Sequence, residues 1–388
     1  MQVNRSWRHF APLTRTCRRS YSESSPGLPP LPPPEKWRRI FDQGNALKDR
    51  ACIKRPDTAQ LVANSFLGDA SPVGGDGKVV IEAFPGPGAL SRALLQLPRS
   101  KIRKLIILED HTEYLPHLKA LEEADSRVHV IPYSGYMWDT YTYLEDTGLL
   151  SDVPTVPWEG GLHPNLHFIS HLQRSIKGEQ LIAQLFRCIP DRTWLYKFGR
   201  VPMSFVMSDW VWTRINSPPG KSTRCKLSVI ADASADCLSA MDWGLLQPYN
   251  DHFHPMTSGH TSLKKPITRQ LGYPFTAVNV IPHADQVIRR GLLEKWDYCL
   301  RRLFVLKSTP LQRSISSLAP GAATLLKTLT DPSLPREQRV DISKPPRGLT
   351  VADWALLVRA FELWPFAPED LMVNDGMTTK IDTDIKLS

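Results

Sequence analysis

The strongest constraint on the fold is a regular alternation of short apolar runs and amphipathic segments in the first half of the chain. The apolar runs are VVIEAF (79–84), KLIILE (104–109) and RVHVI (127–131). Two segments with helical spacing, ALSRALLQL (89–97) and YLPHLKALEEA (114–124), separate them. Strands that alternate with helices of this length form βαβ units, so the sequence predicts a parallel sheet in an α/β fold.

The same pattern continues along the chain and then changes. LHFISHL (166–172) is expected to form a fourth strand, and GEQLIAQLF (178–186) the helix that follows it. Beyond these, we expect a helix over 204–215 and a strand over 226–234. After Pro282 the apolar residues recur at helical spacing, which predicts a small C-terminal helical domain.

Composition divides the chain into five regions. They are a targeting segment at 1–22, a proline-rich linker and basic lead-in at 23–50, a Rossmann-like domain at 51–282, a basic helical domain at 283–368 and an acidic tail at 369–388. The first 22 residues include five arginines and no acid, which is typical of mitochondrial targeting segments. A disordered basic tail is the alternative interpretation of that segment.

Charge is distributed unevenly over the last hundred residues. Between 286 and 347 there are 12 Lys and Arg against 5 Asp and Glu, whereas from 348 onward there are 3 against 7. This asymmetry favours a surface that binds a polyanion, followed by an end that masks it or binds a partner. An uneven but merely solvated surface accounts equally well for these counts.

The sequence gives no reason to expect a metal site, a disulfide framework or a membrane span. Its six cysteines contain no C-x-x-C pair, and the histidine pairs in DHFHP and HPNLH lack a third ligand. No stretch approaches the roughly 20 apolar residues that a membrane helix needs. We therefore predict no metal and no membrane partner.

A glycine-containing turn, FPGPG, connects the first predicted strand to its helix. Gly86 and Gly88 allow the backbone to approach a ligand closely, and the helix that follows presents free N–H groups. The acid expected about 20 residues later is Glu109, at the end of the next strand, where a carboxylate can bond ribose hydroxyls. This combination predicts a nucleoside pocket without distinguishing S-adenosylmethionine from NAD.

The stretch EAFPGPGALSRALL resembles the E-I-G-P-G-x-G-x-L-T-x-x-L motif of the rRNA adenine dimethyltransferases, which use S-adenosylmethionine. The similarity covers roughly residues 55–310. It implies a Rossmann-like methyltransferase fold in which Glu82, Gly86, Gly88 and Glu109 correspond to the cofactor pocket. The stretches IEAFPGPGALSRALL and SGYMWDTY are more similar to the fungal mitochondrial transcription factor B branch of this superfamily than to its enzymes.

Several positions depart from the enzymes of that family. Phe84 replaces the first glycine of the turn, which in the family lies against the cofactor. Ser134 stands where an aspartate would bond the adenine amine. Aligning FISHLQRSI with the catalytic N-L-P-Y motif gives His171, Leu172, Gln173 and Arg174, so the amide that accepts the target amine and the stacking tyrosine are both replaced. Arg174 would also place a cation beside an amine that becomes positive during methyl transfer.

These departures favour a protein that has lost the ability to catalyse methyl transfer. We expect no required cofactor and weak binding of S-adenosylmethionine at most. The resemblance implies a non-catalytic initiation factor of the mitochondrial matrix nucleoid. Its partners would be the mitochondrial RNA polymerase and promoter DNA, above all the melted strand, with rRNA a further candidate. Two alternatives stay open: an active mitochondrial small-subunit rRNA adenine dimethyltransferase, and a general DNA- or RNA-binding scaffold.

Two segments combine aromatic rings with features suited to nucleic acid. Residues 187–226 interleave basic and aromatic side chains, which can contact phosphates and stack on unpaired bases. From this segment we predict contacts by Trp212, Arg214, Arg224 and Lys226. YSGYMWDTY (133–141) is a second aromatic cluster beside the ancestral active site, although loop packing explains it equally well.

Overall fold

The computed structural model describes residues 27–41, 47, 49–68, 77–257 and 267–371. In this part of the chain, the main sheet has seven strands. Their order across the sheet is β4 (Val128–Ile131), β3 (Ile102–Leu108), β2 (Lys78–Ala83), β5 (Leu166–His171), β6 (Met203–Ser208), β9 (Phe275–Pro282) and β7 (Ala235–Ser239). The targeting segment predicted at 1–22 and nearly all of the acidic tail lie outside the described residues.

Strands β4, β3, β2, β5 and β6 are parallel neighbours, whereas β9 runs antiparallel to both β6 and β7. The parallel strands are buried on both faces by helices, as βαβ connections require. The α/β Rossmann-like methyltransferase fold predicted from the sequence is therefore confirmed. Because the carboxyl ends of parallel strands meet at one edge, the segments after β2, β3, β4 and β5 come together there.

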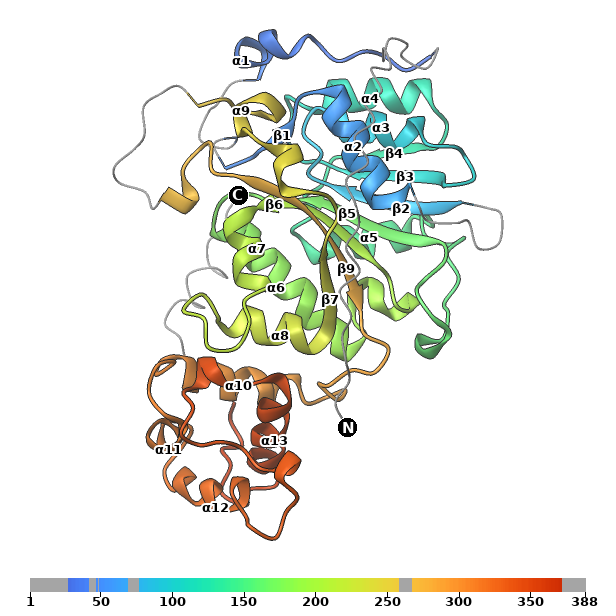
Figure 1. Cartoon of the computed structure of the whole chain (residues 1–388). Helices are drawn as coiled ribbons and strands as arrows, with labels where there is room; N and C mark the ends of the chain where they lie inside the picture. The colour runs from blue at the N-terminus through green and yellow to red at the C-terminus, as the bar shows by residue number, and fades with distance from the viewer. Residues whose placement is uncertain (1–26, 42–46, 48, 69–76, 258–266, 372–388) are drawn as a thin grey trace, which may run out of the picture.

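Helices cover the sheet in two layers (Figure 1). One face packs against α2 (Pro56–Leu67), α3 (Ala89–Gln96) and α4 (Leu115–Ala124). The other packs against α5 (Trp138–Asp146), α6 (Ile176–Asp191), α7 (Asp209–Ile215) and α8 (Lys226–Ser234). Alternate residues of β2 enter opposite cores, since Val79 and Ile81 face the α6 side while Val80 faces α2 and α3.

A group of C-terminal helices follows β9 and packs against α6 and α8 (Figure 1). It contains α10 (Leu293–Phe304), α11 (Leu311–Ser314), α12 (Leu325–Leu329) and α13 (Val351–Glu362). Trp296 and Trp354 are buried, and the Trp354 ring stacks on Phe304 with ring centroids 5.7 Å apart. The cores of these helices and of the α6–α8 layer are continuous.

An N-terminal segment closes one end of the sheet. It contains α1 (Trp37–Ile40) and the short strand β1 (Cys52–Ile53). Strand β1 pairs antiparallel with β8 (Phe253–His254), which directly follows α9 (Tyr249–His252) in the chain. Trp37 is fully buried and its ring lies edge-on to Phe41 and His254. This packing holds residues 49–53 near the carboxyl ends of β2 and β3.

Two secondary-structure predictions were wrong. The stretch 204–215 is a helix only from Asp209, because its first part belongs to β6, which is buried along its whole length. A short continuous apolar run cannot be assigned to helix or strand by periodicity alone. The stretch 226–234 is helix α8 rather than a strand. Its N-terminus is capped by reciprocal contacts between Cys225 and Ser228. The four alanine and serine residues of the stretch offset the strand preference of Val229 and Ile230. Strand β7 begins only at Ala235.

No helix among the described residues is long and apolar enough to span a membrane. The described residues also contain no cluster of three or more side chains suited to hold a metal ion.

Candidate functional site

The turn after β2 keeps the backbone of a ligand-binding turn. Gly86 and Gly88 have φ angles of 66° and 88°, and Phe84 has 62°, in the left-handed region that favours glycine. Phe84 therefore keeps the backbone conformation expected of the glycine that the family resemblance puts at this position. A Cβ atom on Gly86 would lie 2.3 Å from the sulfur of Cys52. The close approach that this glycine permits is thus used by the protein's own N-terminal segment.

Glu109, the acid predicted to bind a ribose, lies just after β3 and is fully buried. Arg50 makes a two-pronged ion pair with it: Nη1 donates to Oε1 at 3.1 Å and Nη2 donates to Oε2. The backbone N–H groups of Gly86 and His111 donate to the same two oxygens, at 3.0 and 3.2 Å. Both oxygens are therefore occupied from within the chain, and a ribose hydroxyl would have to displace Arg50.

Electrostatics stabilise this arrangement. Burial, the largest single effect, would lower the pKa of the Arg50 guanidinium, but the charge and hydrogen bond of Glu109 together with Cys52 and Tyr114 outweigh burial and raise that pKa above its ordinary value. Burial raises the pKa of the neighbouring Cys52 thiol to about 11, although Arg50 opposes the shift. The thiol is therefore neutral at physiological pH, and Glu109 is the closer of the two carboxylates paired with Arg50, since Asp110 Oδ1 lies 3.8 Å from Nη1.

The ring of Phe84 fills the space beside this ion pair. It is 1% exposed, and its centroid lies 5.0 Å from the Arg50 guanidinium carbon. On another side it packs against Gly135, where an added Cβ would be 3.5 Å from the ring. Ser134, at the position of the adenine-binding acid, accepts hydrogen bonds through its carbonyl oxygen from Thr140 Oγ1 and Met137 N. This residue shapes the turn into α5.

The residues that replace the catalytic motif are covered. His171 is 2% exposed and its Nε2 lies 3.7 Å from Oε1 of Glu82, whose other oxygen accepts a 2.6 Å bond from Ser91. Leu172 is buried, and Gln173 is half-buried. The Arg174 N–H donates to the carbonyl of Asp49, in the same N-terminal segment that carries Arg50.

The pocket residues therefore do not fit bound S-adenosylmethionine in this conformation. The Glu109 carboxylate, which was predicted to bind a ribose, is paired with Arg50, and the Phe84 ring lies beside the pair. The catalytic position His171 faces Glu82 in the interior. Sequence reasoning identified Glu82, Gly86, Gly88 and Glu109 but missed Arg50, which looks like any other cation in a basic lead-in.

The four residues predicted to contact nucleic acid differ in how far their side chains are exposed to solvent. Arg224 is 1% exposed and bonds the carbonyl of Ser217 and the carboxylate of Asp232, so its predicted role as a phosphate contact is wrong. The sequence could not show that this cation points inward. Arg214 is ion-paired with Glu179, and Trp212 is half-buried against the core. Lys226 is exposed.

The second aromatic segment, 133–141, is divided by burial, since Tyr141 is buried whereas Tyr133, Met137 and Trp138 are exposed. These three exposed residues, together with Tyr143 just beyond the segment, form what we call the α5 cluster. Each of these side chains is between 38% and 47% exposed. The Tyr133 and Tyr143 rings meet edge to face with centroids 5.1 Å apart. Because β4 ends at Ile131, the cluster lies at the carboxyl-end edge of the sheet, beside the filled pocket.

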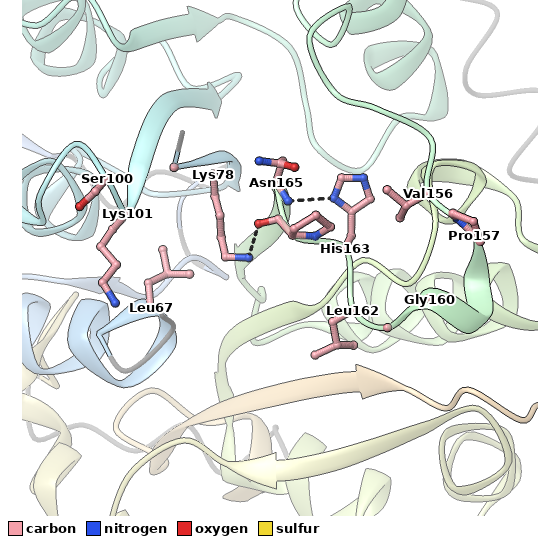
Figure 2. Close-up of a pocket in the computed structure, with 13 residues that line it drawn as sticks. Leu67, Lys78, Ser100, Lys101, Val156, Pro157, Gly160, Leu162, His163 and Asn165 are labelled. Atoms are coloured by element: carbon pink, nitrogen blue, oxygen red, sulfur yellow. Dashed lines mark hydrogen bonds between the residues drawn. The ribbon is translucent and has the colours of Figure 1, made fainter. Parts of the chain in front are cut away.

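Two cavities lie away from that pocket. The larger, of about 660 Å³, is at the opposite edge of the sheet, where β2, β3 and β5 begin (Figure 2). There Lys78 Nζ donates to the Pro164 carbonyl at 2.8 Å, and the Asn165 N–H donates to His163 Nδ1 at 3.2 Å. The smaller, of about 460 Å³, is lined by residues that include Trp138, Glu145, Arg187, Trp194 and Lys197. Neither is lined by the residues of the glycine turn.

Comparison with known proteins gives consistent relatives. Mitochondrial transcription factor 1 of Saccharomyces cerevisiae is 28% identical over 297 residues, which cover 76% of this chain and 82% of that protein. Its counterpart in Lachancea kluyveri is 24% identical over 298 residues, covering 76% and 83%. Mitochondrial dimethyladenosine transferase 1 of Xenopus tropicalis is 30% identical over 152 residues, covering 39% and 41%.

A family model described as ribosomal RNA adenine dimethylase matches residues 57–352. The match includes the main sheet, the glycine turn with Glu109 and most of the C-terminal helices, whereas Arg50 lies before it. Since it spans well over half of the chain, the protein belongs to the ribosomal RNA adenine dimethylase family.

Proposed function

We propose that this protein is a mitochondrial transcription initiation factor that assists the mitochondrial RNA polymerase in promoter recognition and melting. The relatives that match most of its length carry the name mitochondrial transcription factor 1. The proposed location is the matrix nucleoid, reached through the arginine-rich segment 1–22. The proposed partners are the polymerase and promoter DNA, with rRNA retained as a possible ligand of the same surface.

The observation that carries the non-catalytic part of this proposal is the buried ion pair between Arg50 and Glu109. A methylase needs an open pocket for its cofactor and an open face for the target base. Here the chain's own Arg50 and Phe84 occupy the first, and His171 is enclosed at the second. S-adenosylmethionine is therefore neither required nor bound with useful affinity.

An active rRNA adenine dimethyltransferase is the second candidate. The partial similarity to a mitochondrial dimethyladenosine transferase favours it, as does the retained glycine turn. Against it stand the substitutions at Phe84, Ser134 and His171, each of which removes a contact that the family resemblance assigns to cofactor or target base.

The α5 cluster is proposed to hold the melted strand. Aromatic rings stack on unpaired bases of any sequence, and this contact is not available from a closed duplex. Trp138 and Tyr133 are nearly half exposed at the edge of the sheet beside the ancestral target-base site. Binding of single-stranded DNA at this edge would preserve the old location of a nucleic-acid strand after the chemistry was lost.

The decisive test is run-off transcription with the cognate polymerase, with and without the protein, alongside a methyl-transfer assay on a small-subunit rRNA hairpin. We expect stimulated initiation and no transfer. Trp138→Ala should reduce initiation on closed promoters more than on pre-melted ones. Trp243→Ala, which removes another half-exposed tryptophan outside the α5 cluster, is the matched control. Methyl transfer without stimulation would support the enzyme instead, and DNA binding with neither would support the scaffold.

A further inference from the structure

The loop between α7 and α8 reaches the C-terminal helices (Figure 1). The Gly220 N–H donates to the Arg347 carbonyl at 2.8 Å, and Lys307 Nζ donates to the Ser222 carbonyl at 3.1 Å. The Arg347 N–H in turn donates to the Lys307 carbonyl at 3.3 Å. Three segments far apart in the sequence are thereby tied together at one junction between the sheet domain and the helical domain.

Interior hydrogen bonds hold the loop between α7 and α8 in place. The buried guanidinium of Arg224 donates to the Ser217 carbonyl at 2.7 Å and to Asp232 at 3.0 Å. Across the base of the loop, the hydroxyls of Ser217 and Thr223 are 2.7 Å apart. Arg224 therefore supports a basic loop from the interior, although it makes no surface contact itself.

Four cations lie at this junction, which we call the basic junction: Lys221, Lys226, Lys307 and Arg347. The three lysines are exposed and Arg347 is half-buried. Within the described residues, none of the four forms an ion pair with a carboxylate. This differs from Arg187, Arg214 and Arg289, each of which pairs with an acid. Three acids lie six residues from one of these cations in the chain, and Asp232, Asp341 and Asp353 are bonded to Arg224, Ser343 and Thr350 respectively.

We propose that the basic junction binds the phosphate backbone of double-stranded DNA. Cations that have no acidic partner among the described residues, carried both by the loop before α8 and by the C-terminal helices, suit a regular array of phosphates. The loop 217–226 has no aromatic residue, so it offers no ring to stack on a base. The junction therefore holds duplex, whereas the α5 cluster holds the melted strand. This inference rests on the proposed function and specifies which form of the promoter each surface takes.

The test uses the full chain and a fluorescent duplex of about 30 base pairs, with anisotropy titrations across a range of salt concentrations. The junction variant is Lys221→Gln/Lys307→Gln/Arg347→Gln. The control is Lys36→Gln/Arg38→Gln/Arg39→Gln, which removes three exposed cations at α1, at the far end of the molecule (Figure 1). Circular dichroism and melting temperature check that both variants fold.

Each lost phosphate contact reduces the slope of log affinity against log salt by about 0.9, so the junction variant should lose up to roughly 3 from that slope. The control should keep the wild-type slope. Equal slopes for all three proteins would overturn the inference, and so would a junction variant that binds duplex normally but no longer stimulates the polymerase, because the cations would then contact protein. If the wild-type protein neither binds DNA nor stimulates run-off transcription, the proposed function itself fails.

Discussion

The filled pocket and the basic junction both contain basic residues, but the one in the pocket is buried and ion-paired whereas those at the junction form no ion pair within the described part of the chain. In the pocket, Arg50 is buried and bonded through two nitrogens to Glu109. At the junction, Lys221 and Lys307 remain exposed without an acidic partner among the described residues. The pocket binds its own chain, and the junction leaves its charge available to another molecule.

This contrast shows how a binding site can become part of a protein's core. On the proposed function, the polar contacts that a bound cofactor would make in this pocket are made instead by residues 49–53. A buried charge needs a partner whether or not a ligand is present, so Arg50 meets a need that the cofactor would otherwise meet. Binding of another molecule is then left to surfaces where cations have no acidic partner among the described residues and where aromatic rings stay partly exposed.

The largest expected effect comes from breaking the buried pair. Arg50→Ala should lower the free energy of unfolding by about 3–5 kcal/mol, because it leaves the Glu109 carboxylate buried without a counter-ion. Chemical denaturation monitored by circular dichroism measures this change. The effect on salt-dependent DNA binding should be small, since Arg50 is not at the surface.

The matched control is the double variant Arg50→Met/Glu109→Leu, which replaces both charges by apolar groups of similar size. It should be more stable than Arg50→Ala, because no buried charge is left unpaired. An Arg50→Ala protein as stable as wild type would mean that the pocket does not depend on this pair, and the contrast with the junction would disappear.

The second prediction uses pH to distinguish the buried histidines from the lysines and arginines at the surface. Burial lowers the pKa of His167 to about 3, and its Nε2–H donates to Ser204 Oγ, which itself donates to Asn279. The folded state therefore holds this histidine neutral, while the unfolded chain takes up a proton below about pH 6.5. Its contribution to stability is complete above that pH and is lost as the pH falls toward 3.

From pH 6.5 to 5, His167 alone should remove about 2 kcal/mol of unfolding free energy. His254, whose pKa burial lowers to about 4, should add a similar loss. His167→Gln should have a shallower dependence of stability on pH, measured by urea denaturation at several pH values. An unchanged dependence would show that His167 is not held neutral. Duplex binding through lysine and arginine should not vary over this range while the protein stays folded.

The sequence predicted the fold well where the pattern was regular. The strands over 79–84, 104–109 and 127–131 and the helices between them are present, because each run had clear turns at both ends. The errors fell at β6, which is buried along its whole length, and at α8, where a short apolar run gives only a weak periodicity. Strands β7 and β9 were not foreseen, because their antiparallel pairing joins segments far apart in the sequence and departs from the βαβ pattern.

The site was harder to predict, because its important contacts join residues distant in sequence. Glu109 could be placed from its spacing to the glycine turn, but its partner is 59 residues earlier. Arg224 was identified as basic, yet only packing shows that it points inward toward Asp232. Sequence gives the charge of a residue, whereas its exposure depends on the three-dimensional arrangement of several segments.

A third prediction concerns the exposed rings. Trp138→Ala should weaken binding to bubble DNA by about 1–3 kcal/mol, the usual contribution of one stacked base, and leave duplex binding nearly unchanged. Competition titrations with bubble and duplex of the same sequence measure the difference. If both affinities fell together, the ring would serve folding or general binding, and the division between the α5 cluster and the basic junction would be incorrect.

The smallest effect is expected at the C-terminus. Residues 369–388 include five acids against Lys380 and Lys386, and a negative segment opposes binding of DNA to a basic surface. Truncation after residue 368 should strengthen duplex binding by a few tenths of a kcal/mol per screened charge, with the gain shrinking at high salt. Weaker or unchanged binding at low salt would show that the tail does not mask the basic surface.

The most direct test of the central claim is calorimetric titration of the wild-type protein with S-adenosylmethionine. The account predicts no saturable binding in the micromolar range. The three lost family contacts, at about 1–1.5 kcal/mol each, weaken affinity by roughly a hundredfold or more, and the Arg50–Glu109 pair must also open. Saturable micromolar binding, accompanied by methyl transfer to an rRNA hairpin, would contradict the claim that the chain has filled its own cofactor pocket.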